Sequence, residues 1–368
     1  MRRAVVNLLT AMSAFAFCAP VGGAAAQTPL NQTPPASAEA AAPLTAAERK
    51  TVVEQLAERL EARFVFPETG RKYAAMLRAN LESGAYDSLS DALAFARRLT
   101  EDLQAVAPDR HLRVGLRPAG GPGPMRAPGS RNLRVTAIEH SGWIAPGVAY
   151  IRFGLFPGDP ETVAAVRKFL LDHADARTLI IDARGHRGGG LAEMDAMLPL
   201  LYAAPATLVR MDTRADVERG RGPTEDGPTL VRREAPETLV RRDHLVLPEP
   251  QEKRLQDAQV YYLTSKRTAS AAEHLALAFK RTKRAALVGE TTAGAGHYGG
   301  VTPLGERFAA FIPVGRSYDP DTNQGWEAVG VAPDVAVSAE RALERALQLA
   351  GVDPSAIGEA VAAAEPRS

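Results

Sequence analysis

The sequence predicts an α/β domain preceded by a small bundle of helices. Between residues 148 and 350, short apolar strands alternate with helical stretches, and this alternation favours an α/β core. Before that region, apolar residues recur at helical spacing from residue 45 to residue 106. A chain of this size buries enough apolar surface to be stable without covalent cross-links.

The chain begins with features of an export signal. Two arginines precede an apolar stretch that ends at Phe17, and three alanines before Gln27 provide a cleavage site. We therefore expect a signal peptide over 1–26 and a periplasmic or secreted location. Residues 27–44, rich in Ala, Pro, Gln and Thr, are expected to form a disordered linker.

Composition argues against several other classes of function. Cys18 is the only cysteine, so the exported chain would have no disulfide, thiol nucleophile or cysteine metal site. A formal net charge of +1 gives no reason to expect nucleic acid or an anionic membrane as partner. No later segment is long and apolar enough to span a bilayer. No histidine pair has the spacing of a metal site, so we expect no metal and no cofactor.

The first folded region, predicted over 45–115, reads as about three helices. Its apolar residues fall on one helical face. The helical pattern is interrupted at Phe66-Pro67 and at Ser83-Gly84, where proline and glycine break helices. The bundle is expected to end in the loop Ala107-Pro-Asp-Arg-His111.

The core domain is predicted over 131–350, after a glycine- and proline-rich loop at 117–130 and before a C-terminal tail at 351–368. Residues 204–250 are charged and are expected to be irregular surface excursions. The expected strands are 148–153, 179–182, 260–264, 286–289 and 308–313, and the expected helices are 161–173, 192–201, 270–281 and 338–350.

Ser270 stands where a buried strand runs into a helix. A hydroxyl at this position lies beside unpaired backbone N–H groups and the positive end of the helix dipole. The same N–H groups can hold a developing oxyanion, as acyl transfer requires. The alternative is a helix cap, because Ser270-Ala-Ala-Glu273 fits the capping-box pattern.

A glycine-rich loop follows the strand that ends at Asp182 and reads Ala-Arg-Gly-His-Arg-Gly188-Gly189-Gly190. Glycines allow a ligand to approach backbone N–H groups closely. The spacing does not fit a phosphate-binding loop, and no Gly-Lys-Ser/Thr ending is present. A tight strand-to-helix turn is the structural alternative.

Together with Val288-Gly-Glu-Thr-Thr-Ala-Gly294, these pieces resemble the tail-specific (carboxy-terminal-processing) serine peptidase family with its tricorn-type core. The helical leader and Gly325-Trp-Glu-Ala-Val-Gly-Val-Ala-Pro-Asp334 resemble the branch named for interphotoreceptor retinoid-binding protein. The resemblance implies a ClpP/crotonase-like spiral core. Too few residues separate His111 from the strand at 148 for the PDZ domain that many members carry.

The resemblance also implies roles for particular residues. Ser270 matches the nucleophile, and the N–H groups of Ala271, Gly188 and Gly189 match the oxyanion hole. The family's lysine base is missing, because the segment after Gly-Glu-Thr-Thr reads Ala293-Gly-Ala-Gly-His.

Without that lysine, the tricorn arrangement is the better template. It makes His111 the general base and Glu327 the carboxylate that orients it, a chemically coherent set. His297, in the segment where the lysine would be, is the alternative base. His186 is expected to point to solvent, and the histidines without a motif are expected at the surface or at caps: His140, His173, His244 and His274.

The sequence thus predicts an exported serine-type peptidase that acts on polypeptide, with a homo-oligomer as an open possibility. The alternative is a non-catalytic binder of an apolar ligand, such as a retinoid or fatty acid, on the same fold. The intact serine and glycine loop favour the enzyme.

Overall fold

The structure, a computed structural model, describes residues 42–117, 136–219 and 224–365. Three sequence predictions fall wholly or mostly outside these ranges: the signal peptide, the disordered linker and the glycine- and proline-rich loop. Among the described residues, no helix is both long enough and apolar enough to cross a membrane.

Three helices open the described chain, and each starts where a local signal places it. Thr45 and Asp91 cap two of them, each accepting a backbone N–H of the first turn. Pro67 is the first residue of the remaining helix, a position where a backbone N–H would have no partner within the helix, so the N–H that proline lacks is not missed. The helices bury one face against strands β1 and β11, so they share a core with a sheet. They are α2 (Ala46–Arg63), α3 (Pro67–Glu82) and α4 (Ala92–Val106), and the strands are β1 (Arg113–Leu116) and β11 (Phe308–Tyr318).

A largely parallel sheet forms the centre of the α/β region. Its strand order is β12-β9-β8-β4-β3-β2, and only the β2–β3 pair is antiparallel. The strands are β2 (Ile138–Ala145), β3 (Val148–Phe153), β4 (Thr178–Asp182), β8 (Gln259–Thr264), β9 (Ala286–Gly289) and β12 (Val335–Ala336).

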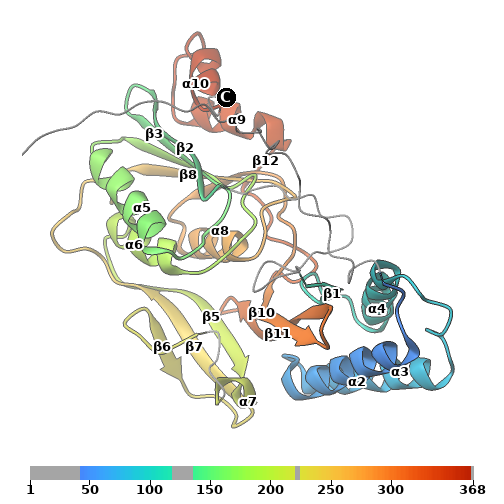
Figure 1. The fold of residues 1–368 in the computed structure, drawn as a ribbon. Helices are drawn as coiled ribbons and strands as arrows, with labels where there is room; N and C mark the ends of the chain where they lie inside the picture. Colours follow the sequence, from blue (N-terminus) through green and yellow to red (C-terminus); the bar gives the residue numbers. More distant parts are fainter. Residues whose placement is uncertain (1–41, 118–135, 220–223, 366–368) are drawn as a thin grey trace, which may run out of the picture. The chain divides into compact units, whose positions relative to one another are not determined.

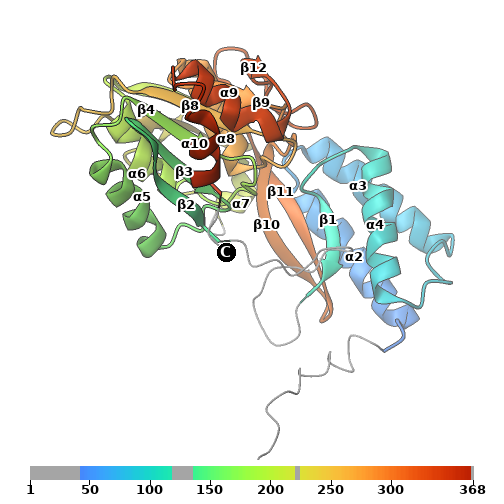
Figure 2. The same cartoon turned by 90° about the horizontal axis from the view of Figure 1, so that it is seen from above.

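Helices cover both faces of this sheet, as the continuous apolar character of its inner strands requires. Alternate residues point to opposite faces: Ile181 belongs to the core beneath one helix layer and Ile180 to the core beneath the other. Figure 2 shows the two layers from above. One contains α5 (Pro160–Asp172), α6 (Ala192–Leu201) and α8 (Ala271–Thr282), and the other α9 (Ala342–Leu349) and α10 (Ile357–Ala363).

A second, antiparallel sheet has the order β1-β11-β5-β7-β6, with β10 also paired to β11. Strand β11 therefore lies between two parts of this one sheet. On one side are the strands that pack on α2–α4; on the other is an arm that consists of the three strands β5, β6 and β7 and the short helix α7 (Figure 1). The remaining elements are β5 (Ala206–Arg214), α7 (Ala215–Glu218), β6 (Leu230–Arg233), β7 (Leu239–Val246) and β10 (His297–Leu304).

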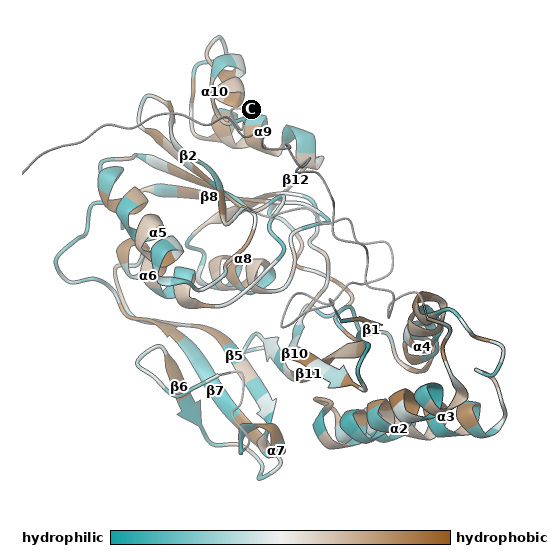
Figure 3. Ribbon diagram, viewed as in Figure 1, coloured by the Kyte–Doolittle hydropathy of each residue, from teal (hydrophilic) through white to brown (hydrophobic). Residues whose placement is uncertain are grey.

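The prediction that 204–250 is irregular is wrong, because that region contains the arm. Its strand pattern is hidden by charged residues that pair across the strands. Arg210 binds Asp243 at 2.6 Å, and Arg241 binds Asp212 at 2.7 Å. Figure 3 shows teal, hydrophilic residues along β6 and β7, where a buried strand would be brown. Paired charges can occupy a sheet face as apolar residues do, but they leave no hydrophobic alternation to read.

The predicted strands and helices of the parallel-sheet region are otherwise confirmed, with ends that shift by a residue or two. The exceptions are the strand predicted at 308–313, which continues to Tyr318, and the helix at 338–350, which begins with a 3-10 turn. Strands β1, β2, β10 and β12 were not predicted.

Candidate active site

Two loops meet at the edge of the parallel sheet. One follows β4 and contains the glycine run, and the other follows β8 and ends at Ser270. Because β4 and β8 are adjacent and parallel, the two loops leave the sheet side by side. The Thr268 hydroxyl donates to the carbonyl of Ala183 at 2.7 Å, and the Ala269 N–H donates to the carbonyl of His186 at 3.0 Å. These bonds fix the serine beside the glycines.

Ser270 has a backbone conformation that non-glycine residues rarely adopt, with φ 59° and ψ −120°. Such a conformation costs on the order of 1–3 kcal/mol and is common at functional sites. It turns the chain sharply between β8 and α8, in the way that a strand-to-helix nucleophile is presented. The helix cap is present too, because the Glu273 carboxylate accepts the Ser270 N–H at 2.8 Å.

Glu273 is fully buried and connects the serine to a third loop. Its carboxylate also accepts the Thr292 hydroxyl at 2.6 Å and the N–H groups of Gly294 at 2.6 Å and Ala295 at 2.8 Å. Burial raises the pKa of this carboxyl, while its four donors favour the charged form. Glu273 thereby holds the start of α8 against the segment that leads to His297.

In the glycine loop, the N–H of Gly189 is available to the site and that of Gly188 is not. The Gly188 N–H is already used, because it donates to His186 Nδ1 at 3.0 Å. Among the described residues, the N–H groups of Gly189 and Ala271 have no acceptor. Gly189 has φ 132°, and a Cβ there would lie 1.8 Å from the carbonyl oxygen of Phe156, so only glycine fits.

His186 is buried, so the prediction that it points to solvent is wrong. Burial lowers its pKa to about 3. Since Nδ1 accepts the Gly188 N–H, the neutral ring carries its proton on Nε2, which has no partner among the described atoms. His186 therefore acts on the shape of the glycine loop.

His297, at the start of β10, shares a pocket with Ser270. Its Nδ1 lies 2.7 Å from Oδ2 of Asp109, and 188 residues separate the two in sequence. The neutral ring donates its Nδ1 proton to this carboxylate and so has its lone pair on Nε2. A histidine oriented in this way is suited to act as a general base.

Asp109 is the carboxylate of this candidate site that sequence reasoning missed. Only 2% of it is exposed, and its Oδ1 accepts the N–H groups of His111 and Leu112, both at 2.9 Å. Burial alone would raise its pKa, but the bonds from His297 and from these N–H groups outweigh burial and lower it. The only signal in the sequence was its position in the loop that contains His111.

Glu327 connects the loop that contains Asp109 to the segment that leads into His297, because it accepts backbone N–H groups from both. Its Oε1 accepts the Arg110 N–H at 2.7 Å, and its Oε2 accepts the N–H groups of Gly296 at 2.6 Å and His297 at 3.0 Å. Its Oε2 lies 3.8 Å from His297 Nδ1.

Asp109, His297 and Glu327 offer ligand atoms within 4.8 Å of one another, a spacing that could hold a metal ion. However, Asp109 and Glu327 each accept at least three hydrogen bonds from the protein. The donors already satisfy the carboxylates, so the cluster is best described as a hydrogen-bonded one.

The His111 backbone N–H binds Asp109, but its ring forms no hydrogen bond with this group. Its ring stacks on Phe311 with 5.2 Å between centroids, and its Nδ1 is buried with no partner among the described atoms. Burial lowers its pKa to about 4. No hydrogen bond among the described residues joins its ring to Ser270 or to Glu327, and it lines a second pocket instead.

The pocket that contains Ser270 has a volume of about 340 Å³. The arm supplies part of its wall, which is why the misread 204–250 region matters for the site. The larger apolar and aromatic residues that line the pocket, two of them from the arm, are Leu191, Met211, Leu230, His274, Tyr298 and Trp326.

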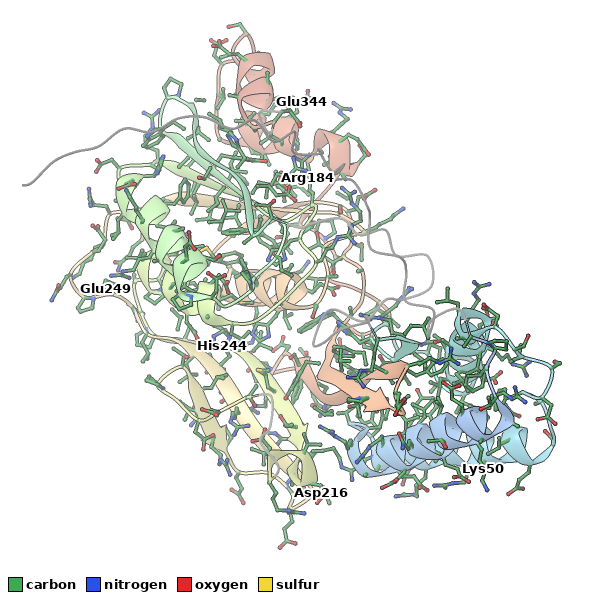
Figure 4. All side chains as sticks on the ribbon, viewed as in Figure 1. Lys50, Arg184, Asp216, His244, Glu249 and Glu344 are labelled. Carbon is green, nitrogen blue, oxygen red and sulfur yellow. The ribbon has the colours of Figure 1, made fainter. Side chains whose placement is uncertain are left out.

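His244 and His274 are both buried, so the prediction that they lie at the surface or at helix caps is wrong. His274 Nε2 lies 2.9 Å from His244 Nδ1, and His244 Nε2 lies 3.0 Å from the carboxylate of Asp195. Figure 4 labels His244 near the base of the arm. Because Asp195 can only accept, neutral His244 accepts from His274, whose Nδ1 then remains an acceptor. Burial lowers the pKa of His274 well below its usual value.

A serine at a strained strand-to-helix turn, with two free N–H groups beside it, is typical of a serine hydrolase. Comparison with known proteins agrees. Residues 147–337 match peptidase family S41, and residues 39–128 match the N-terminal domain of that family in eukaryotic IRBP. The chain therefore belongs to peptidase family S41 and is a serine-type peptidase. The resemblance to tail-specific peptidases is confirmed.

Several solved structures are similar to this chain at low identity. A candidate peptidase from Parabacteroides merdae is 15% identical, with a TM-score of 0.56 over 82% of this chain and 96% of that one. A lipoprotein from Streptococcus agalactiae is 13% identical, with a TM-score of 0.52 and the same coverages. The photosystem II D1 C-terminal processing protease is 17% identical, with a TM-score of 0.49 over 80% and 94%.

Proposed function

We propose that Ser270 is the nucleophile of this peptidase and that His297, oriented by Asp109, is its base. The observation that carries the proposal is the 2.7 Å contact between His297 Nδ1 and Asp109, beside a pocket that both Ser270 and His297 line. His297 Nε2 takes the hydroxyl proton as Ser270 attacks the scissile carbonyl. It then gives that proton to the leaving amine, and water releases the acyl group by the same route.

The oxyanion of each tetrahedral intermediate is bound by the N–H groups of Gly189 and Ala271. Both are free among the described residues, whereas the Gly188 N–H is held by His186. The N–H of Ala271 also stands at the positive end of α8, which favours a negative charge there. Removal of one such donor costs about a hundredfold or more in rate.

Geometry favours His297 over His111 as the base. His111 lines a different pocket, stacks on Phe311 and, with a pKa of about 4, accepts a proton poorly near neutral pH. Glu327 acts through the backbone, holding the Arg110 and His297 loops together. Its part is to position the base.

The remaining assignments extend the proposal to the whole chain. We infer export to the periplasm or outside the cell, a polypeptide substrate, and a core of the ClpP/crotonase-like spiral type without a PDZ domain. The division into a helical domain over 45–115 and a core over 131–350 stays a prediction, as does a homo-oligomer.

Labelling with a fluorophosphonate probe tests the nucleophile. We expect the wild-type protein to be labelled and the Ser270→Ala variant to be inert, with both folded by circular dichroism. Labelling of both, or of neither, would contradict the assignment.

Comparison of His297→Ala with His111→Ala tests the base. We expect labelling and peptide hydrolysis to fall by several orders of magnitude in the first variant and by much less in the second. If His111→Ala is the inactive variant, the triad proposed from the sequence is the better one. Retinol or oleate binding by a protein that fails to label would favour the apolar-ligand binder instead.

A further inference from the structure

His274 offers an unused hydrogen-bond acceptor to the pocket that contains Ser270. It lies on α8, roughly one helical turn after the serine, and lines that pocket. Its Nε2 lies 2.9 Å from His244, whereas its Nδ1 has no hydrogen-bond partner among the described residues. That Nδ1 is not sealed off from solvent either. Because only 3% of the residue is exposed, the open side of the ring is the side that faces the pocket.

Two further residues keep the lone pair on this Nδ1. The Asp195 carboxylate can only accept, so it takes the Nε2 proton of His244 at 3.0 Å. His244 then accepts from His274, which keeps the His274 proton on Nε2. Burial disfavours the charged form of His274 and lowers its pKa well below the usual value. The pocket therefore contains a neutral ring whose free nitrogen accepts a hydrogen bond.

Several other polar side chains of the lining are unsuited to this role. The Tyr298 hydroxyl is bonded to Thr213 at 2.6 Å, and Trp326 Nε1 donates to the carbonyl of Ala295 at 3.1 Å. The Ser317 hydroxyl lines the pocket as well, but a hydroxyl can donate as well as accept. None of these groups selects a donor as a lone pair on a ring nitrogen does.

The charges around the pocket favour a neutral occupant. Glu225 contributes a carboxylate to the lining, but this residue is exposed and water screens its charge. A lysine or arginine side chain deep in the pocket would therefore have no buried counter-ion, and burial of an unpaired charge is costly. An acidic side chain would face the acceptor of His274. A neutral O–H or N–H group can bond to that acceptor without either penalty.

The place and size of the pocket indicate which residue of a substrate enters it. Its lining contains Ser270, His297 and the two proposed oxyanion donors, Gly189 and Ala271. The nearest side chain of a bound peptide is thus that of the residue whose carbonyl is attacked. A volume of about 340 Å³ is close to the lower end of ligand pockets, about 300 Å³. Together with the apolar and aromatic lining, it suits one large side chain.

We propose that this pocket selects tyrosine or tryptophan at the residue whose carbonyl is attacked, with the substrate O–H or N–H bonded to His274 Nδ1. The proposal rests on the peptidase function above and deepens it. These side chains bury an apolar ring and still need a partner for their polar group. Phenylalanine has a similar ring but no donor. His244 and Asp195 do not line the pocket, so they act as positioning residues.

The test compares peptides that differ only at the residue before the cleaved bond. A random peptide library is digested with the wild type, and mass spectrometry identifies one well-cleaved sequence. That sequence is then made with tyrosine, O-methyltyrosine, phenylalanine, tryptophan or 1-methyltryptophan at this position. The two methylated residues keep the aromatic ring but cannot donate. The value of kcat/KM is measured for each peptide.

We expect the tyrosine peptide to exceed both the phenylalanine and the O-methyltyrosine peptides, and tryptophan to exceed 1-methyltryptophan. A closed site that loses a hydrogen bond discriminates very strongly. Here the pocket reaches the exposed Glu225, so water can replace the missing donor, and the expected ratio is about tenfold.

Two variants separate the acceptor from the residues that orient it. His274→Phe keeps a ring but removes the acceptor, so it should cleave the phenylalanine peptide and lose the preference for tyrosine. His244→Leu no longer fixes the tautomer of His274 and should lower the same ratio. His140→Phe is the matched control, because His140 is half-buried and lines neither pocket. It should keep the preference.

Equal kcat/KM for tyrosine, phenylalanine and O-methyltyrosine, from a wild type whose Ser270 is labelled, would overturn the selectivity and leave the peptidase standing. This comparison decides even if the variants do not fold. A tyrosine preference that survives in folded His274→Phe would overturn the acceptor, and one that survives in His244→Leu would overturn the role of the positioning residues. A labelled wild type that cleaves nothing in the library would overturn the substrate assignment, and one that neither labels nor cleaves would overturn both proposals.

Discussion

Replacement of Asp109 by asparagine tests the proposed base most sharply. The carboxylate accepts two backbone N–H groups at Oδ1 and faces His297 with Oδ2. Asparagine can keep the first set through its carbonyl oxygen, and then its NH₂ group faces His297 Nδ1. The ring must accept this bond at Nδ1, so its proton moves to Nε2. A histidine in that tautomer cannot take the proton of Ser270.

The expected loss follows from that tautomer. In a serine peptidase, a triad histidine in the wrong tautomer lowers kcat by a factor on the order of 10⁴. This corresponds to an activation free energy higher by about 5.4 kcal/mol, at about 1.36 kcal/mol per tenfold change in rate. The folded protein should tolerate the change, because the backbone acceptor remains. We expect the free energy of unfolding near neutral pH to fall by about 3 kcal/mol or less, within the range for one altered charged hydrogen bond.

The assay is hydrolysis of a peptide substrate together with the rate of fluorophosphonate labelling, at matched circular dichroism and melting temperature. Asp87→Asn makes the same charge change at an exposed position and serves as control. Because His297 and Asp109 act as a unit, the double variant His297→Ala/Asp109→Asn should be little worse than His297→Ala alone. A folded Asp109→Asn protein with kcat within threefold of the wild type would refute the reasoning.

Three further predictions concern the glycine loop and the serine. Gly189→Ala should lower kcat about a hundredfold or more, because its Cβ would collide with the carbonyl of Phe156 and move an oxyanion donor; unchanged kcat in a folded variant would count against that donor. His186 has a folded pKa of about 3, so acid from about pH 6.5 downward protonates only the unfolded state and should destabilise the protein by up to about 1.4 kcal/mol per pH unit. Urea titrations should find that slope reduced in His186→Asn, which still offers an acceptor to the loop and should keep more activity than His186→Leu. Ser270→Gly should be inactive yet melt at a higher temperature than Ser270→Ala, since glycine relieves the positive φ; equal melting temperatures would show that the strain is small.

The local parts of the site could be predicted from the sequence. The sequence places Ser270 at the start of a helix after a buried strand and pairs it with Glu273, because a capping box is a pattern over four residues. It also predicts a loop at the glycine run after Asp182, since glycine permits conformations that expose backbone N–H groups. Both features depend on residues that are neighbours in the chain.

The arm and the buried histidines could not be predicted in this way. Strands β5 and β7 are joined by pairs such as Arg210 and Asp243, which remove the hydrophobic alternation that marks a strand. His244 and His274 are buried because each satisfies the other, and a single sequence does not show which polar residues will meet.

The sequence by itself determined the α/β class and the position of the serine, because periodicity, glycine and capping act over a few residues; the family followed from the resemblance of its motifs. Only the tertiary structure shows which of the two candidate histidines has a carboxylate beside its ring: His297, next to Asp109. Strand β11 pairs with β1 on one side and β10 on the other, and this brings the loop of Asp109 to His297 across 188 residues of sequence. A contact of that separation depends on how the strands pack together, and neither local sequence predicts it.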